Sequence, residues 1–235
     1  MKIEIWSDIA CPWCAIGKRR FERALEQFEP RDAVEVIWRS FELDPTAPRR
    51  HGQPQAELLA AKYGVPLAQA QAMNARMAGE AAKEGLRFDL DGAQVGNTFD
   101  AHRLIHFAAA EGRRDAVVDR LFRAYLAEGR AIGESDVLVE IAAEAGLDAA
   151  AVRAMLASDA YAAAVRADEA RARMFGITGV PFFAIDERVG VSGAQPPEVL
   201  LEVLREAWRE SAATPAAPAP PAGEADACAD GYCAI

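Results

Sequence analysis

The stretch MKIEIWSDIACPWCAIG, residues 1–17, decides the fold. Ile3 and Ile5 alternate with Lys, Glu and Trp, which is typical of a short β-strand. From 12 to 28 apolar residues recur at helical spacing, and a proline suits the first turn. A second alternating segment follows at 33–39. The chain is therefore predicted to open with a β-α-β unit.

Beyond this unit the patterns are helical from 56 to 175, in segments rich in Ala, Leu, Glu and Arg that glycines separate. Extended patterns return at 181–185 and 188–191 as a hairpin, before a final helix at 197–208. This order favours an α/β protein with a thioredoxin-like fold (β-α-β plus β-β-α) interrupted by a large all-helical insertion, although periodicity alone also fits other α/β arrangements. The helical segments are 56–63, 66–84, 98–110, 114–128, 135–145 and 160–175.

Composition and pattern divide the chain into four parts. We expect the first half of the thioredoxin-like domain at 1–55, the helical insertion at 56–175 and the second half at 176–210. Residues 211–235 are rich in Ala and Pro and have little to bury, so they are predicted to form a flexible tail, which ends in a Cys-x4-Cys motif.

Length and charge exclude several classes of protein. The chain has 235 residues, enough for a core that needs no disulfides. Its formal net charge of −10 argues against an extended nucleic-acid or polybasic membrane surface. No apolar run is long enough to span a bilayer, and residues 1–6 lack the apolar core of an export signal. We therefore expect a cytoplasmic protein without nucleic-acid or membrane partners, whose cysteines are catalytic or metal-binding.

The motif Cys11-Pro12-Trp13-Cys14 stands where the first strand gives way to the first helix. Unpaired N–H groups and the positive end of the helix dipole favour an anion there, so we expect a low pKa for Cys11. As the more exposed thiol, Cys11 would attack a disulfide to form a mixed disulfide, which Cys14 would resolve from one turn behind. The motif thus predicts a redox dithiol with Cys11 as nucleophile and Cys14 as resolving thiol.

Two other interpretations of the cysteines stay open at this stage. One is a structural pair without chemistry. The other is a zinc-binding interaction protein, whose four-cysteine site would need Cys228 and Cys233 at the far end of the chain. His102 and His106 share a helix face at a spacing that can bind metal, but no Glu follows His102 as in zinc proteases. We predict no metal site.

Five segments make a more specific pattern than the cysteine pair alone. They are 11–18 (CPWCAIGK), 38–45 (WRSFELDP), 97–104 (NTFDAHRL), 179–183 (GVPFF) and 192–195 (SGAQ). In this order they resemble the DsbA-like thioredoxin superfamily, specifically its cytoplasmic FrnE-type oxidoreductases. The resemblance runs from near residue 1 to residue 210. It implies a thioredoxin fold with a helical insertion and thiol–disulfide exchange on protein or small-molecule disulfides.

The resemblance also implies which residues meet the substrate. Pro181 would be a cis-proline that faces Cys11, and the backbone of Val180 would bind an extended substrate as an added strand. Pro12 and Trp13, between the two cysteines, are expected to contact the substrate and to influence the redox potential.

Further expectations concern His102 and the tail. The resemblance places His102 on a helix that lines the substrate cleft. Relatives of this type carry a second cysteine pair near the C-terminus, which Cys228 and Cys233 match; we call these two residues the tail pair and expect an accessory redox role. The expected partners are disulfide-containing proteins, with glutathione or a thioredoxin-like reductant, and no cofactor is implied.

One position departs from the related proteins. They often have a buried carboxylate six residues before the attacking cysteine, where this chain has Ile5. Asp8, Glu4 or a water molecule would have to accept the proton of Cys14, and Asp8 is the best placed.

The resemblance leaves one rival activity. Glutathione-dependent isomerases or transferases of the kappa and hydroxychromene-carboxylate type share this architecture, but they generally have Ser at the attacking position. Cys11 therefore favours redox chemistry, and oxidase, reductase and isomerase reactions all stay open.

Overall fold

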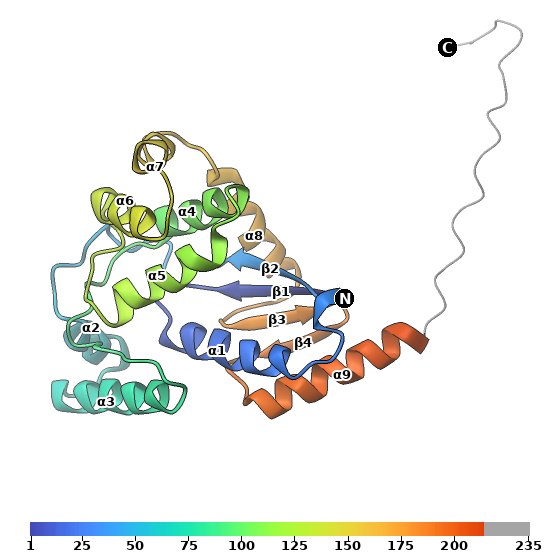
Figure 1. The fold of residues 1–235 in the computed structure, drawn as a ribbon. Coiled ribbons are helices and arrows are strands. Elements are labelled where there is room, and N and C mark those ends of the chain that lie inside the picture. Colours follow the sequence, from blue (N-terminus) through green and yellow to red (C-terminus); the bar gives the residue numbers. More distant parts are fainter. Residues whose placement is uncertain (214–235) are drawn as a thin grey trace, which may run out of the picture.

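A computed structural model describes residues 1–213 of the chain. A four-stranded sheet has helices on both faces, and a block of helices lies at one end of it (Figure 1). The elements, in order, are β1 (Lys2–Ser7), α1 (Pro12–Glu26), β2 (Glu35–Ser40), α2 (Gln55–Tyr63), α3 (Leu67–Lys83), α4 (Phe99–Ala110), α5 (Arg114–Leu126), α6 (Ser135–Glu144), α7 (Ala149–Leu156), α8 (Ala162–Met174), β3 (Phe182–Ile185), β4 (Val189–Ser192) and α9 (Pro197–Ala213).

The sheet order is β2-β1-β3-β4. β1 lies in the middle, parallel to β2 and antiparallel to β3, with Ile5 opposite Trp38 on one side and Phe183 on the other. β3 and β4 form the predicted hairpin, whose turn residues Asp186 and Glu187 both have positive φ. The two halves of the sheet, far apart in the sequence, thus meet along β1.

Both faces of β1 are buried, by different helices. Ile3 and Ile5 face α1 and α9 and pack in a cluster that includes Phe21, Phe183 and Leu204. On the opposite face, Glu4 and Trp6 face α8, and Trp6 packs against Ala172 and Phe182. This alternation of side chains is what a strand imposes. Because both sets are covered, β1 is fixed from both sides.

The helical block between β2 and β3 has its own core, which also contains both cysteines of the CPWC motif. Leu104, Leu121 and Leu138 are fully buried at its centre, and Cys11 and Cys14 belong to the same cluster. The predicted helices of this region are present, and an additional eight-residue helix, α7, was not predicted from the sequence. Asp148 caps α7 by accepting hydrogen bonds from two backbone N–H groups, a signal that the sequence did contain. Among residues 1–213, no helix combines the length and the apolar character needed to cross a bilayer.

Candidate active site

Cys11 lies at the amino end of α1, after a turn closed by a hydrogen bond from its N–H to the Asp8 carbonyl (3.1 Å). The first turn of α1 contains Pro12 and no acidic side chain. A hydrogen bond from the Cys14 thiol lowers the pKa of Cys11. The backbone N–H groups of Cys14 and Trp13 lower it too, while burial and the charge of Asp8 raise it, and the net direction is down. The amino end of α1 therefore favours an anionic Cys11, as the motif predicts.

Cys14 lies behind Cys11 and is the more deeply buried of the two free thiols, at 1 % exposed against 6 %. Burial raises the pKa of Cys14 well above its usual value, and the hydrogen bond to Cys11 and the charge there raise it further. The Asp8 backbone and the Ser7 hydroxyl act in the opposite direction. The two thiols are thus chemically distinct, because Cys11 ionises more readily than Cys14. Trp13, between them in the sequence, is 40 % exposed.

The Val180–Pro181 segment lies against the start of α1, although it is far away in the sequence. The Val180–Pro181 peptide bond is cis, as the resemblance implies. The Cys11 thiol is 3.6 Å from the Val180 carbonyl oxygen and donates to it. A Cβ atom on Gly17 would lie 2.8 Å from Cγ of Pro181, so the close approach of α1 to this proline depends on the glycine. Gly193 N–H donates to the Pro181 carbonyl (2.8 Å) and holds the segment to the end of β4.

Asp8 is buried beside the cysteines, on the turn between β1 and α1. Its carboxylate accepts hydrogen bonds from the N–H groups of Ala10 (3.2 Å) and Leu43 (2.8 Å). His102 Nε2 lies 3.4 Å from Asp8 Oδ1. Two backbone N–H donors therefore fix the Asp8 carboxylate in the turn before the CPWC motif, and the backbone of the same residue acts on Cys14.

Two sequence expectations change in the light of the structure. His102 was expected to line the substrate cleft, but it is 2 % exposed and faces Asp8 behind the cysteines, so it cannot meet a substrate at the surface. Glu4, named as an alternative proton acceptor for Cys14, points to the α8 face of β1 and binds Arg39 and Arg171. Periodicity predicts on which face of its helix or strand a residue lies, but it does not predict which element packs against that face.

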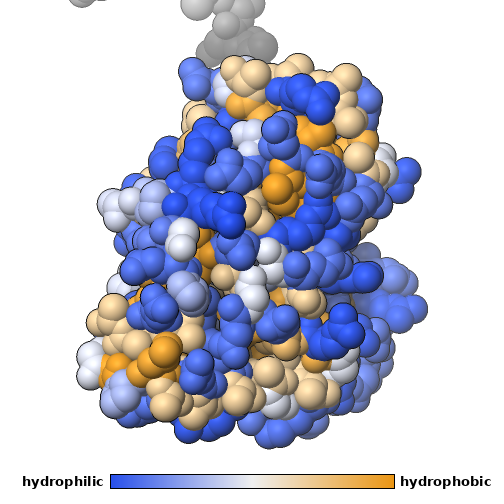
Figure 2. Space-filling model, turned by 90° about the vertical axis from the view of Figure 1, so that its left-hand side faces the viewer, coloured by the Kyte–Doolittle hydropathy of each residue, from blue (hydrophilic) through white to orange (hydrophobic). Residues whose placement is uncertain are grey.

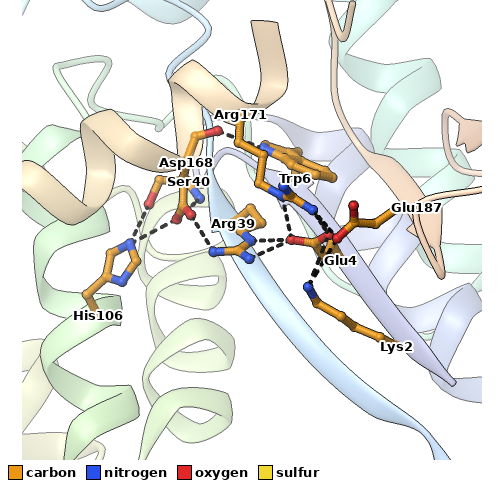
Figure 3. A network of polar contacts seen from close by, with 9 residues as sticks. All are labelled: Lys2, Glu4, Trp6, Arg39, Ser40, His106, Asp168, Arg171 and Glu187. Carbon is orange, nitrogen blue, oxygen red and sulfur yellow. Dashed lines mark hydrogen bonds and ion pairs between the residues drawn. The ribbon is translucent and has the colours of Figure 1, made fainter. Parts of the chain in front are cut away.

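Figure 3 shows the polar network that joins β1, β2, α4 and α8 behind the site. Arg39 stands between two buried carboxylates and donates to Glu4 (2.7 and 2.5 Å) and to Asp168 (2.8 Å). Arg171 donates to both oxygens of Glu4 (2.9 and 2.6 Å). His106 Nε2 lies 3.0 Å from Asp168 Oδ2, so the two helix histidines face different carboxylates. No local sequence pattern predicts this network.

The zinc interpretation needs metal ligands from two distant parts of the chain. Within residues 1–213, no three His, Cys, Asp or Glu side chains converge as a metal site. The tail pair, Cys228 and Cys233, which both the zinc and the accessory redox interpretations need, lies outside the described residues.

The side of the molecule toward which β1 and β2 run faces the viewer in Figure 2. It is mostly hydrophilic, with small apolar patches between charged side chains. A cavity of about 640 Å³ lies along α1, lined by Ala15, Lys18 and Glu22 on this helix. The cavity therefore lies beside α1, further along the helix than the CPWC motif, and neither cysteine lines it.

Comparison with known proteins identifies the class that this fold and this pair of thiols define. The model of the DSBA-like thioredoxin domain matches residues 2–205, nearly the whole chain. The protein belongs to this family, and its fold is the thioredoxin fold that the sequence predicted.

Individual relatives agree with this assignment. A probable DsbA oxidoreductase from Streptomyces coelicolor has a similar structure, with a TM-score of 0.86 and 51% identity over 89% of this chain and 91% of its own. The uncharacterized protein YwbO of Bacillus subtilis is 29% identical over 207 residues, which are 86% of this chain and 94% of YwbO. The cytosolic disulfide reductase DsbM from Pseudomonas aeruginosa, solved with GSH, shares the fold at 20% identity and a TM-score of 0.61, over 89% of this chain and all of DsbM (100%).

Proposed function

We propose that this protein is a dithiol–disulfide oxidoreductase that acts on disulfides of proteins or small molecules through Cys11 and Cys14. One observation carries the proposal: two free thiols lie next to each other at the amino end of a helix, and their pKa values are shifted in opposite directions. Stepwise exchange requires a front thiol that ionises more readily than the thiol behind it.

The reaction would proceed in two exchanges. The Cys11 thiolate attacks one sulfur of the substrate disulfide; a bond forms between them, and the other substrate sulfur leaves as a thiolate and takes a proton. Cys14 then loses its proton and attacks Cys11, forming the Cys11–Cys14 disulfide and releasing the second substrate thiol. The substrate gains two electrons and the enzyme dithiol loses two. The reverse sequence oxidises a substrate dithiol, and attack without the second exchange permits isomerisation.

The surroundings of Cys11 favour an extended peptide as the main substrate. Val180 precedes β3, and its carbonyl faces the Cys11 sulfur, so a peptide beside 178–180 would place its own disulfide at the nucleophile. The half-exposed Trp13 adds apolar contact area beside the thiols. We propose that Pro12, Trp13, Val180 and Pro181 together form the substrate-contacting surface.

Glutathione is a second partner that the site suits. The cavity along α1 is lined by the basic side chains of Arg19, Arg87 and Arg123 and by the acidic side chains of Glu22, Asp119 and Glu128. It therefore offers partners for both the carboxylates and the amine of a small peptide. The solved structure of DsbM with GSH supports this choice. We propose glutathione, or a thioredoxin-like protein, as the reductant that restores the dithiol, and a cytoplasmic location in which such reductants are abundant.

A thiol assay with matched serine variants tests the proposal. We expect the full chain to reduce insulin or to recover scrambled ribonuclease, Cys11→Ser to abolish both activities, and Cys14→Ser to accumulate a mixed disulfide with the substrate. A glutathione-dependent isomerase or transferase would keep turning over without a Cys14 thiol. Undiminished disulfide exchange by Cys11→Ser would remove the proposed function.

A further inference from the structure

Cys14 must lose a proton each time it resolves a mixed disulfide, and it is 1 % exposed. Water at the surface therefore cannot take that proton directly. Transfer has to pass through polar groups inside the protein, and the polar side chains next to Cys14 decide the route. This reasoning rests on the proposed function, because only the exchange reaction requires Cys14 to ionise.

Two buried polar atoms behind Cys14 lack an ordinary partner. Among the described residues, Ser7 Oγ and His102 Nε2 form no hydrogen bond of normal geometry. The Ser7 hydroxyl faces Cys14 closely enough to lower the pKa of that thiol, and His102 Nε2 is 3.4 Å from Asp8 without hydrogen-bond alignment. Buried polar groups are nearly always satisfied, so atoms of this kind mark a position for a bridging molecule or a moving proton.

A small cavity connects these atoms to a second histidine. It has a volume of about 10 Å³, room for roughly one water molecule. Its wall contains five polar side chains that can form hydrogen bonds with such a water: Ser7, Arg39, Ser40, His102 and His106. His106 is 22 % exposed and lies 3.2 Å from Ser40 and 3.0 Å from Asp168. The cavity therefore joins the buried end of the site to a group that reaches solvent.

We propose that His102 is a positioning residue for proton transfer, and that it links Cys14 and Asp8 through one buried water to His106 and the solvent. In the resolving step the Cys14 proton passes to Asp8, or through the Ser7 hydroxyl, which accepts it and gives up its own. The Cys14 sulfur bonds to Cys11, and the Cys11–substrate bond breaks as the substrate sulfur leaves as a thiolate. His102 and the water carry the proton onward, and His106 releases it outside. In the reverse reaction the proton returns along the same path.

Several titratable or charged groups lie near His102 and the small cavity. Because they interact, a pH profile of the second release reports their titrations together. Burial and the charge of Asp8 both raise the pKa of Tyr125, so this hydroxyl keeps its proton and does not compete as an acceptor. The titratable or charged neighbours are Asp8 after β1, Cys11 and Cys14 on α1, Arg39 on β2, Tyr125 on α5, His106 on α4 and Asp168 on α8.

The two exchange steps separate when the chain reacts with the aromatic disulfide 5,5′-dithiobis(2-nitrobenzoate). Attack by Cys11 releases one thionitrobenzoate, and resolution by Cys14 releases a second, so absorbance resolves both rates. The full chain is used with serine at both tail cysteines, so that the two releases come from the site pair. Cys14→Ser must lose the second release and Cys11→Ser the first. If they do not, the proposed function fails, independently of His102.

His102→Gln and His106→Gln test the relay. His51→Gln is the matched control, because His51 is the remaining histidine of the chain and does not line the cavity. We expect both relay variants to slow the second release by about tenfold or more, which is below the roughly 10²–10⁴-fold of a direct general acid or base because these residues act one transfer away from the sulfur. The pH of half-maximal rate should also rise. A purely structural role would scale the rate without moving that pH.

An unchanged second release in either relay variant, with the Cys14→Ser control behaving as stated, overturns the relay and leaves the proposed function standing. If His102→Gln does not fold, the relay is tested instead on the protein with both histidines in place. The second release is measured in mixtures of light and heavy water: transfer through a chain of groups gives a curved dependence on the deuterium fraction, and a linear dependence overturns the relay.

Discussion

Neutralising Glu4 should weaken the fold by an amount that depends on pH. Burial alone would raise the pKa of Glu4, but Arg171 and Arg39 overcome it and lower the pKa from 4.5 to about 2. At about 1.4 kcal/mol per pH unit, this difference corresponds to about 3 kcal/mol. Because the folded-state pKa lies below the unfolded one, the stabilisation is complete above about pH 4.5 and is lost as the pH falls through about 2. Glu4→Gln at pH 7 should therefore cost about 3 kcal/mol.

Urea unfolding followed by tryptophan fluorescence measures this cost at a series of pH values. Other carboxylates titrate in the same range, so the informative quantity is the difference between Glu4→Gln and the unchanged chain, which should shrink steadily between about pH 4.5 and 2. Glu35→Gln, an exposed carboxylate on the neighbouring strand β2, is the control and should change stability by less than about 0.5 kcal/mol. A loss for Glu4→Gln that stays constant down to pH 2 would refute the ion-pair origin, and a loss below about 1 kcal/mol would refute its magnitude.

Three further changes probe the site itself. Asp8→Asn should lower the pKa of Cys11, because the charge of Asp8 raises it. The rate of Cys11 alkylation across a pH series measures this pKa, and an unchanged or higher midpoint would contradict the proximity of Asp8 to Cys11. Gly17→Ala should destabilise the fold by about 1 kcal/mol and slow disulfide exchange, since the new methyl group meets Pro181 at 2.8 Å. Gly79→Ala, in an open part of α3, is the control and should stabilise the fold by up to about 1 kcal/mol. Thermal unfolding measures both changes, and stability changes of the same sign would count against the Gly17–Pro181 contact. Serine at both positions of the tail pair should alter the turnover of the full chain or the accessibility of the site thiols, and identical values would make the tail a bystander.

The sequence predicted the elements of the sheet but not their order. Alternation at 2–6 and helical spacing after Cys11 are local signals, and the structure confirms both. The central place of β1 depends on pairing with β3, about 180 residues further along, for which no local pattern exists. α7 was missed because it is short and rich in alanine, so its periodicity is weak, although Asp148 marks its beginning.

Some residues of the site could be predicted from local motifs and others could not. Cys11, Cys14 and Pro181 were found from motifs, because their chemistry is tied to residue type and spacing. Ser7 and the true environment of His102 were not, because hydroxyls and histidines occur widely and only the neighbours across the fold give them a task. The Cys11–Val180 contact joins residues 169 positions apart, and without the resemblance nothing in the sequence would have paired them.

Glu4 shows how the helical block shapes the site as well as covering the sheet. A charged residue in the middle of an alternating strand predicts a face open to water, yet Glu4 is 1 % exposed because α8 lies on that face and supplies Arg171. The chain leaves α8 at Met174 and reaches Val180 six residues later, so the ion pairs that hold α8 to β1 also limit where Val180 lies. Cys11 comes only four residues after β1 ends at Ser7. One strand therefore anchors both the nucleophile and the carbonyl opposite it, and a change at Glu4 that loosens α8 should weaken disulfide exchange even though Glu4 never touches the sulfurs.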